Sequence, residues 1–330
     1  MQLDKTRIAI RERGMLEIMD LALQVLRSYT VTFATARPTE PRASTETSWL
    51  HYFGDEVAYW LGRNGLGPLT AAFFLGIAPF AIFNAWVLSP FADPAYYEMN
   101  PGEYIWLMIL MVFFQAPLAT SLATCYLGKA VFEENPSLGE VLSDVWQMFW
   151  QIFVCQVLIR VVGPAMVVAW FLEIGNRNNG AIHAVLAVGA FYASIIRALR
   201  PYINEIVLLE KSPLFSSDAD TMTVNRRSAA LHDPSSGQLL GRWIVTVAVA
   251  VVASLSLILG SFFIFAVTFS RWEFTPFILH FLIPACLWLV SAYFAVVRFL
   301  FYLDLRIRRE GWEVELRIRA EAGRMTRQLV

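Results

Sequence analysis

The sequence predicts an all-α fold: a polytopic membrane bundle of six transmembrane helices, with amphipathic surface helices at the cytoplasmic face. The composition points to a membrane protein, because 57% of the 330 residues are apolar and only 16% are charged. Soluble domains carry about 25% charged residues. Long apolar runs recur along the chain, and basic residues lie almost entirely at the two ends of the chain and in every second segment between the runs. This alternation is typical of helices that cross a membrane repeatedly.

The N-terminal region, residues 1–64, is predicted to lie in the cytoplasm and to contain an amphipathic interfacial helix at 13–29. Polar side chains in that stretch recur at helical spacing, which places them on one face. They are Arg13, Glu17, Asp20, Gln24 and Arg27. We expect such a helix to lie along the inner leaflet or to pack under the bundle, and an ordinary partner helix of a small cytoplasmic bundle is the equal alternative. After a polar linker that contains proline, residues 49–64 are typical of a second surface helix.

Six apolar runs predict the transmembrane domain, residues 65–302. A hydrocarbon core of roughly 30 Å needs about 20 apolar helical residues, because no backbone polar group can stay unpaired in lipid. The spans are expected at about 65–88, 104–128, 145–172, 181–200, 243–270 and 274–302. The fourth run is short, and snorkelling of Arg197 and Arg200 extends it. Only residues 271–273 separate the last two spans, so a tight hairpin must join them.

The distribution of basic residues predicts how the spans are oriented. Basic residues concentrate on the cytoplasmic side of bacterial-type membrane proteins. With the N-terminus inside, and with the span ends that carry Arg197, Arg200 and Arg298 counted as cytoplasmic, the cytoplasmic segments are 1–64, 129–150, 197–242 and 298–330. They hold all of the 26 Lys and Arg residues except Arg160, Arg177 and Arg271. The sequence therefore predicts a multi-pass protein of the bacterial inner membrane with both termini in the cytoplasm.

Two cytoplasmic segments connect the spans. Ser137, followed by Glu140, is a capping-box start, so the third span is expected to be entered through a helix that begins on the cytoplasmic surface. The longer loop, 201–242, includes residues 211–241, in which Ser, Asp, Pro and Gly dominate. No apolar period there is long enough for a core, so this part is predicted to be a mobile connector or a docking segment.

The C-terminal tail, residues 303–330, is predicted to lie beside the membrane. We expect the sixth span to continue as a helix to about Arg309, to break at Gly311 and to be followed by a short surface helix. Apolar and charged residues alternate strictly over 312–319, which is typical of a strand, and with 303–308 before the turn at 309–311 a β-hairpin is the alternative. The basic side chains of the tail are candidate contacts for anionic lipid headgroups. They are Arg306, Arg308, Arg309, Arg317 and Arg319.

Arg160 is the candidate functional residue inside the membrane. A guanidinium near the centre of a bilayer costs about 2.5 to 3.5 kcal/mol, so it usually faces a partner or a watery cavity. A structural interpretation is also open. Pro164 lacks the N–H that would bond the carbonyl of residue 160, and Gln156 lies one turn away, so this turn is locally polar and kinked.

No catalytic residue, cofactor or metal site is predicted. Beyond the fourth span, Arg197, Arg200, Glu205 and Glu210 are interpreted as a cytoplasmic polar network of surface salt bridges, with acid/base catalysis as the alternative. The histidines are isolated, either in apolar runs or beside a single aspartate, and no third ligand accompanies them. An embedded enzyme would need several titratable groups converging at one depth, and the sequence predicts no such cluster. The three cysteines read as small apolar core residues.

Three pieces of sequence carry a resemblance to a known family. They are "EIMDLALQVLRSY" before the first span, "RPYINEIVLLE" with "RRSAALH" between the fourth and fifth, and "YLDLRIRREGWEVE" after the last. In this order they resemble a broad group of bacterial six-span membrane proteins, related in pattern to the membrane domain fused to some glycerophosphodiester phosphodiesterases. The resemblance implies an all-helical inner-membrane bundle with a surface helix at each end. It implies no catalytic residues, because the His and carboxylate motifs of the phosphodiesterase domain are missing here.

Two functions are compatible with these features. The first is a membrane scaffold or anchor that binds partner proteins through its cytoplasmic ends and the 211–241 loop. The second is a permease for a lipid or small solute, with Arg160 in the pathway. The expected partners are membrane lipids and a possible protein at the cytoplasmic face, with no nucleic acid, while the oligomeric state is not predicted. A polar cavity at Arg160 would favour the permease, and burial against backbone carbonyls would favour the scaffold.

Overall fold

A computed structural model describes residues 14–31, 49, 53–57, 67–89, 101–131, 136–160, 162–176, 179–216 and 221–310. Every regular element in these ranges is helical, and they contain no β-strand. Six helical segments within them are long and apolar enough to cross a membrane. The predicted all-α bundle with six candidate spans is therefore confirmed.

The spans are formed by helices that mostly match the predicted apolar runs. In chain order they are α3 (Pro68–Val87), α5 (Pro101–Ala119) with α6 (Ser121–Ala130), α7 (Leu138–Phe153) with the π-helix η4 (Val154–Leu158), α9 (Asn179–Leu199), α12 (Ser236–Phe269), and the π-helix η6 (Ile278–Leu282) with α13 (Ile283–Glu310). A shorter apolar helix, α8 (Val162–Asn176), lies between η4 and α9 in the chain. α12 ends at a left-handed residue, Ser270, with φ 53°, and the chain turns back there as the predicted hairpin.

The third predicted span differs from the single helix expected over 145–172, because the structure divides it into α7 with η4, which is long enough to cross a membrane, and the shorter helix α8. At the break, the N–H of Ile159 donates to the carbonyl of Val154 at 3.0 Å, which is the wide spacing of a π-turn. Pro164 has no N–H to donate to the carbonyl of Arg160, so the α-helical ladder cannot run through this point. The break therefore places Arg160 in a turn.

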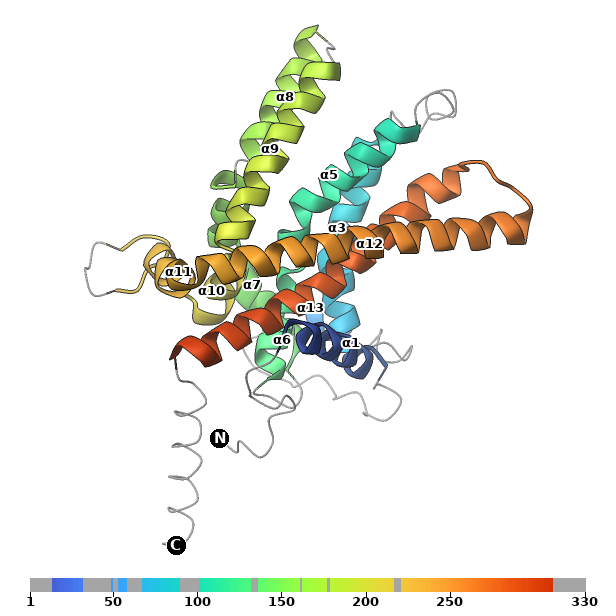
Figure 1. The fold of residues 1–330 in the computed structure, drawn as a ribbon. Coiled ribbons are helices and arrows are strands. Elements are labelled where there is room, and N and C mark those ends of the chain that lie inside the picture. The colour runs from blue at the N-terminus through green and yellow to red at the C-terminus, as the bar shows by residue number, and fades with distance from the viewer. Residues whose placement is uncertain are drawn as a thin grey trace, which may run out of the picture.

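The spans fan out from one end of the molecule, which we call the base (Figure 1). α8 pairs with α9, α3 with α5, and α12 with α13. The base is formed by α6, α7, the last turns of α13, and two short helices, α10 (Ile203–Glu210) and α11 (Val224–His232). α1 (Met15–Val31) lies there too, against α13 and α3.

The amphipathic helix expected at 13–29 is present as α1, and it packs under the bundle. Its apolar face is buried at Ile18, Met19, Ala22 and Val25. The Tyr293 hydroxyl of α13 donates to the carbonyl of Met19 at 3.1 Å, which fixes the helix to the sixth span. α1 is therefore a partner of the transmembrane helices α13 and α3.

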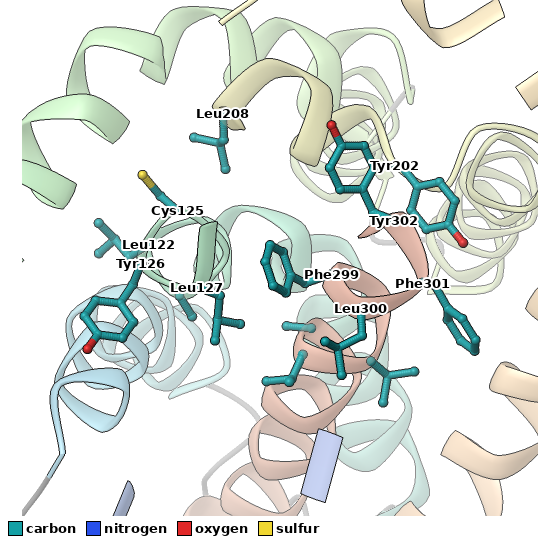
Figure 2. Packing of buried hydrophobic residues seen from close by; sticks show 14 of the residues in the cluster. Leu122, Cys125, Tyr126, Leu127, Tyr202, Leu208, Phe299, Leu300, Phe301 and Tyr302 are labelled. Atoms are coloured by element: carbon teal, nitrogen blue, oxygen red, sulfur yellow. The ribbon is translucent and has the colours of Figure 1, made fainter. Parts of the chain in front are cut away.

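Apolar side chains from distant parts of the chain form the core of the base (Figure 2). Leu122, Cys125, Tyr126 and Leu127 come from α6, Tyr202 and Leu208 from the α10 region, and Phe299, Leu300, Phe301 and Tyr302 from α13. α13 supplies these side chains because it stays helical through Arg309, as predicted. The predicted break at 311 and the rest of the tail lie outside the described residues.

The prediction that residues 211–241 contribute nothing to a core is wrong. They contain α11, whose first turn is capped by the hydroxyl of Thr223, and the side chains of Leu231 and His232 are buried. The N–H of Tyr202 donates to Nε2 of His232 at 3.4 Å, and the two rings stack with centroids 5.6 Å apart. Polar side chains that satisfy backbone groups let a short helix with few apolar residues pack inward. Residues 217–220 lie outside the described part of the loop.

The surface of α12 requires an apolar surrounding. Within its most apolar 18-residue window, 0% of the residues are buried inside the protein. Side chains such as Val252, Leu259 and Ile264 are more than half exposed. An apolar helix of this length with so much of its surface exposed is stable only where something other than water covers that surface, as lipid does for a transmembrane helix.

Candidate functional site

A proline in α5 leaves a backbone carbonyl free to form a polar contact with another span. Pro117 has no N–H, so the carbonyl of Phe113, one turn earlier, lacks its helical donor. Nη2 of Arg197, from α9, donates to this carbonyl at 2.7 Å. The same guanidinium lies 4.0 Å from the centroid of the Phe113 ring. The kink in α5 therefore holds an arginine among apolar helices.

Asn204 of α10 connects the same proline to the third span. Its Nδ2 donates to the carbonyl of Pro117 at 2.8 Å, and its Oδ1 accepts a hydrogen bond from Nε2 of Gln156. Asn204 and Gln156 are each 2% exposed. A buried amide with both ends bonded fixes the position of the backbone that carries it. The next residue, Glu205, is therefore held at a defined place in the interior.

Glu205 is fully buried and forms an ion pair with the sixth span. Its Oε1 lies 2.6 Å from Nε of Arg298, and the carboxylate side chain is 0% exposed. Its other oxygen, Oε2, has no hydrogen-bond partner among the described residues. The sequence assigned Glu205 to the surface, whereas the structure places it inside the base.

Arg160 lies beside this ion pair and is 2% exposed. It interacts electrostatically with the carboxylate of Glu205 and with the guanidinium of Arg298. Its Nε is buried, and no described group accepts a hydrogen bond from it. Arg197 interacts electrostatically with both of these arginines. We call Arg160, Arg197, Glu205 and Arg298 the buried charge cluster, in which Arg160 and Glu205 are buried and Arg197 and Arg298 are partly exposed. The prediction that titratable groups do not converge at one depth is therefore wrong.

The predicted cytoplasmic polar network is not a single network. Arg197 and Glu205 belong to the buried charge cluster. Nη1 of Arg200 donates to Oδ1 of Asn225 at 2.6 Å. Glu210 forms a two-pronged ion pair with Arg227, with N–O distances of 2.5 and 3.1 Å. The sequence grouped these residues because they are close along the chain, but their partners lie on three helices: α5 for Arg197, α13 for Glu205, and α11 for Arg200 and Glu210.

The arginines predicted to contact lipid headgroups also bind protein groups. Arg306 lies 3.9 Å from Glu210, Arg308 lies 3.1 Å from Asp304, and Nε of Arg309 donates to Oγ of Ser235 at 3.0 Å. Arg308 and Arg309 are nevertheless exposed at the base. Contact with headgroups stays a prediction for these three residues. Arg317 and Arg319 lie outside the described residues.

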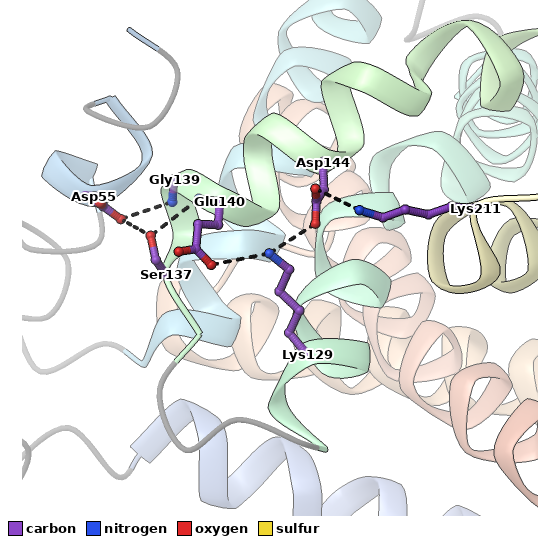
Figure 3. A network of polar contacts seen from close by, with 7 residues as sticks. All are labelled: Asp55, Lys129, Ser137, Gly139, Glu140, Asp144 and Lys211. Atoms are coloured by element: carbon purple, nitrogen blue, oxygen red, sulfur yellow. Dashed lines mark hydrogen bonds and ion pairs between the residues drawn. The ribbon is translucent and has the colours of Figure 1, made fainter. Parts of the chain in front are cut away.

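A second polar network fixes the start of α7 (Figure 3). As predicted, the hydroxyl of Ser137 accepts the N–H of Glu140, and it donates to Oδ1 of Asp55 at 2.7 Å. The Asp55 oxygen also accepts the N–H of Gly139 at 3.0 Å. The Glu140 carboxylate pairs with Lys129 at 3.5 Å. α7 is thus capped from outside its own helix.

Asp144 of α7 extends this network to two further segments (Figure 3). Its carboxylate lies 3.0 Å from Nζ of Lys129, at the end of α6, and 3.1 Å from Nζ of Lys211, just after α10. Three pieces of the base are joined by one carboxylate. Because these side chains are partly exposed, each pair contributes only about 0.5 kcal/mol after screening by solvent.

At the ends of the spans opposite the base, two histidines that the sequence leaves isolated have partners on α5. Nε2 of His183 lies 2.9 Å from Oε1 of Glu103. Nδ1 of His280 lies 2.9 Å from the hydroxyl of Tyr104, which is 1% exposed. Across the described residues, no group of three or more His, Cys, Asp or Glu side chains is placed to hold a metal ion. These pairs therefore tie spans together.

The sequence reasoning missed Arg298 and Asn204. Arg298 was counted with the cytoplasmic basic residues because it is the first charge after an apolar run. The run resumes from Phe299 to Leu303, however, and a helix that continues through both parts carries Arg298 within the bundle. That resumption was a usable signal. Nothing in the local pattern marks Asn204, since its role depends on a proline far away in the chain.

No family model, curated protein or solved structure matches this chain. The resemblance to the six-span group related in pattern to the phosphodiesterase membrane domain therefore stays a prediction. What the chain defines from its own residues is a class: a multi-pass helical membrane protein with a buried charge cluster near one end of its spans.

Proposed function

We propose that the protein belongs to the bacterial inner membrane, with both termini and the base in the cytoplasm. All but three of its 26 Lys and Arg residues lie in segments assigned to that side. In the structure, α1 and the last turns of α13 lie at the same end of the bundle (Figure 1). Both observations agree with an even number of crossings.

Within that membrane, the protein acts as a permease for a lipid or small solute, with Arg160 in the pathway. One observation carries this proposal: Arg160 is buried, and its Nε has no acceptor among the described groups. A buried donor without a partner costs about 1 to 3 kcal/mol, and more if it is charged. A passive anchor gains nothing from that cost. In a permease, the passing solute supplies the missing acceptor.

Flux into vesicles tests the permease. The purified protein is reconstituted into vesicles of phosphatidylethanolamine and phosphatidylglycerol. One assay follows exchange of fluorescently labelled phosphatidylglycerol between leaflets, and the other follows uptake of radiolabelled orthophosphate. We expect at least one probe to move faster than in protein-free vesicles. Arg160→Leu should abolish the movement, whereas Arg271→Leu, an exposed arginine in the distant hairpin, should retain it. No movement of either probe, or equal movement with Arg160→Leu, contradicts the permease.

A scaffold for partner proteins is the second candidate, and one observation favours it. Phe215, next to the base, is 86% exposed, the largest exposed fraction among the exposed large apolar side chains of the described residues. On this proposal, one cytoplasmic protein co-purifies with the wild type at a fixed ratio. Phe215→Ser removes it, and Arg160→Leu does not. Loss of the partner with Arg160→Leu, but not with Phe215→Ser, would contradict the scaffold.

A further inference from the structure

The buried charge cluster carries more positive than negative charge. Arg197 interacts electrostatically with Arg160 and with Arg298, and Arg160 also interacts with Arg298. Among the described residues, Glu205 is the carboxylate that acts on Arg160 and on Arg298. Arginine stays charged even when it is buried. Three guanidinium groups and one carboxylate leave an excess of two positive charges, which is costly in a low-dielectric interior.

Each of the three guanidinium groups also has a donor atom left over. Nε of Arg160, Nε of Arg197 and Nη2 of Arg298 are buried, and none has a hydrogen-bond partner in the part of the chain that the structure describes. The three residues come from the turn after η4, from α9 and from α13. Native proteins leave few buried donors unbonded, so three in one cluster indicate that a partner is missing.

Bonds through other atoms hold two of these arginines in position. Arg197 is fixed through Nη2 on the carbonyl of Phe113, and Arg298 through Nε on Glu205. Arg160 lies one turn after Gln156, whose amide is bonded to Asn204, the residue before Glu205. Because these bonds use other atoms, the unbonded donors of Arg197 and Arg298 are pre-positioned.

We propose that the buried charge cluster binds a doubly charged phosphate group, carried either by free phosphate or by the headgroup of a lipid. This inference rests on the proposed function and names the chemistry of its substrate. A phosphate group carries about −1.5 to −2 charge at pH 7 and presents three acceptor oxygens. It matches both the charge excess and the unbonded donors. A carboxylate would leave one positive charge uncompensated, and chloride cannot use the forked geometry of a guanidinium.

Glu205 acts as the internal counter-ion while the phosphate is absent. It bonds Arg298 through Oε1, and its unbonded Oε2 faces the same interior. An incoming phosphate is repelled by this carboxylate, so binding is a competition between two anions for the same guanidinium groups. The donor atoms are closed to solvent in this structure, and the phosphate reaches them through a local opening of the helices.

Thermal unfolding of the full chain in an uncharged detergent tests the site. Inorganic phosphate is the first probe and short-chain phosphatidic acid is the second, with chloride at matched ionic strength and short-chain phosphatidylglycerol as references. An apparent Kd follows from the dependence of Tm on probe concentration. Arg160→Gln removes one cation, Glu205→Gln removes the competing anion, and Arg271→Gln is the matched control outside the site.

We expect inorganic phosphate, short-chain phosphatidic acid or both to raise Tm more than chloride and short-chain phosphatidylglycerol do. Stabilisation by inorganic phosphate identifies a free anion as the source, and stabilisation by phosphatidic acid alone identifies a lipid. Arg160→Gln should weaken binding by about tenfold or more, as expected for loss of a charged hydrogen bond. Glu205→Gln should tighten it, and Arg271→Gln should leave it unchanged. If Arg160 and Glu205 had only structural roles, their substitutions would not change the affinity for phosphate in opposite directions.

Several outcomes overturn the inference. They are an equal response to chloride and phosphate, no response to either probe, and weaker binding with Glu205→Gln. If Arg160→Gln does not fold, the wild-type response and Glu205→Gln decide. The result is separable from the proposed function. Binding without flux in vesicles removes the permease and keeps the site, whereas lipid exchange without phosphate binding keeps the permease and removes the site.

Discussion

Single backbone atoms organise the interior of this protein. Because Pro117 lacks an N–H, the carbonyl of Phe113 is left to accept Arg197 from α9, while the carbonyl of Pro117 accepts Asn204 from α10. Polar side chains are thereby held in an apolar setting by main-chain acceptors, which cannot move away as a side chain can. Pro117, which is not itself a member of the buried charge cluster, therefore positions Arg197 and the residue before Glu205.

The capping contacts at the start of α7 predict a coupled effect on stability. Ser137→Ala should lower the free energy of unfolding by about 1 kcal/mol, the usual cost of losing an N-cap. Asp55→Ala loses bonds to Ser137 and to Gly139. Because the two side chains share a bond, we expect the double variant to lose less than the sum of the single losses. Thermal unfolding of the four proteins measures this, and strictly additive losses would refute the shared cap.

Removing either of two tyrosine hydroxyls on α13 should lower the stability of the protein, but by different amounts. The hydroxyl of Tyr302 donates to the Glu210 carboxylate at 2.6 Å, while that of Tyr293 donates to the neutral carbonyl of Met19 at 3.1 Å. A hydrogen bond to a charged group contributes about 1.5 to 3 kcal/mol, and a neutral one about 1. Tyr302→Phe should therefore lower Tm more than Tyr293→Phe. An equal or reversed order would show that the carboxylate bond adds nothing.

At the scale of helices, the main feature is the close approach of neighbouring backbones at glycines. At Gly76 of α3, an added Cβ would lie 2.1 Å from the carbonyl oxygen of Ala119, where α5 passes into α6. Gly54 is similarly close to the backbone of Gly139, so the helical residues 53–57 approach α7 without side chains between them. Such glycines let backbones touch, which is how membrane helices pack when lipid offers no hydrophobic driving force between them.

Gly76→Ala should separate α3 from α5. The new methyl group meets a backbone oxygen, which cannot turn aside, so we expect a loss of about 1 to 3 kcal/mol and a clear fall in Tm. Gly260→Ala is the matched control, because α12 offers open space around that position. Its Tm should stay within a degree or two of the wild type, on the order expected for surface substitutions. If both variants behave alike, the close approach of α3 to α5 is wrong.

For the whole molecule, the number of spans was predictable, whereas the contacts between them were not. Apolar length alone located six spans, since it follows directly from the thickness of hydrocarbon. The break in the third span was predictable only in part. Pro164 suggested a kink, but a sequence pattern does not distinguish a bent helix from two helices with a π-turn between them.

The candidate site was predictable only where a single residue stood out. Arg160 is visible because one charge interrupts an apolar run. Its neighbours Glu205 and Arg298 were assigned to the surface, since their burial arises from packing between elements far apart in the chain. The pairs of His183 with Glu103 and of His280 with Tyr104 span 80 and 176 residues, distances over which no local period carries information.

The proposed orientation predicts which surfaces a membrane-impermeant maleimide reaches in intact cells. Glu273→Cys, in the exposed hairpin opposite the base, should react, and Phe215→Cys should react only after the cells are opened. The background is low, because the native Cys125, Cys155 and Cys286 are all buried. Labelling of Phe215→Cys in intact cells would reverse the orientation and place the base outside the cytoplasm.

The length of α12 ties the protein to the thickness of its membrane. Its 34 residues extend about 51 Å, well beyond roughly 30 Å of hydrocarbon. The helix therefore leans, or its first turns stand in the headgroup layer. A thinner bilayer makes it lean further and a thicker one lets it rise, so the angle between α12 and its neighbours α9 and α13 varies with lipid chain length.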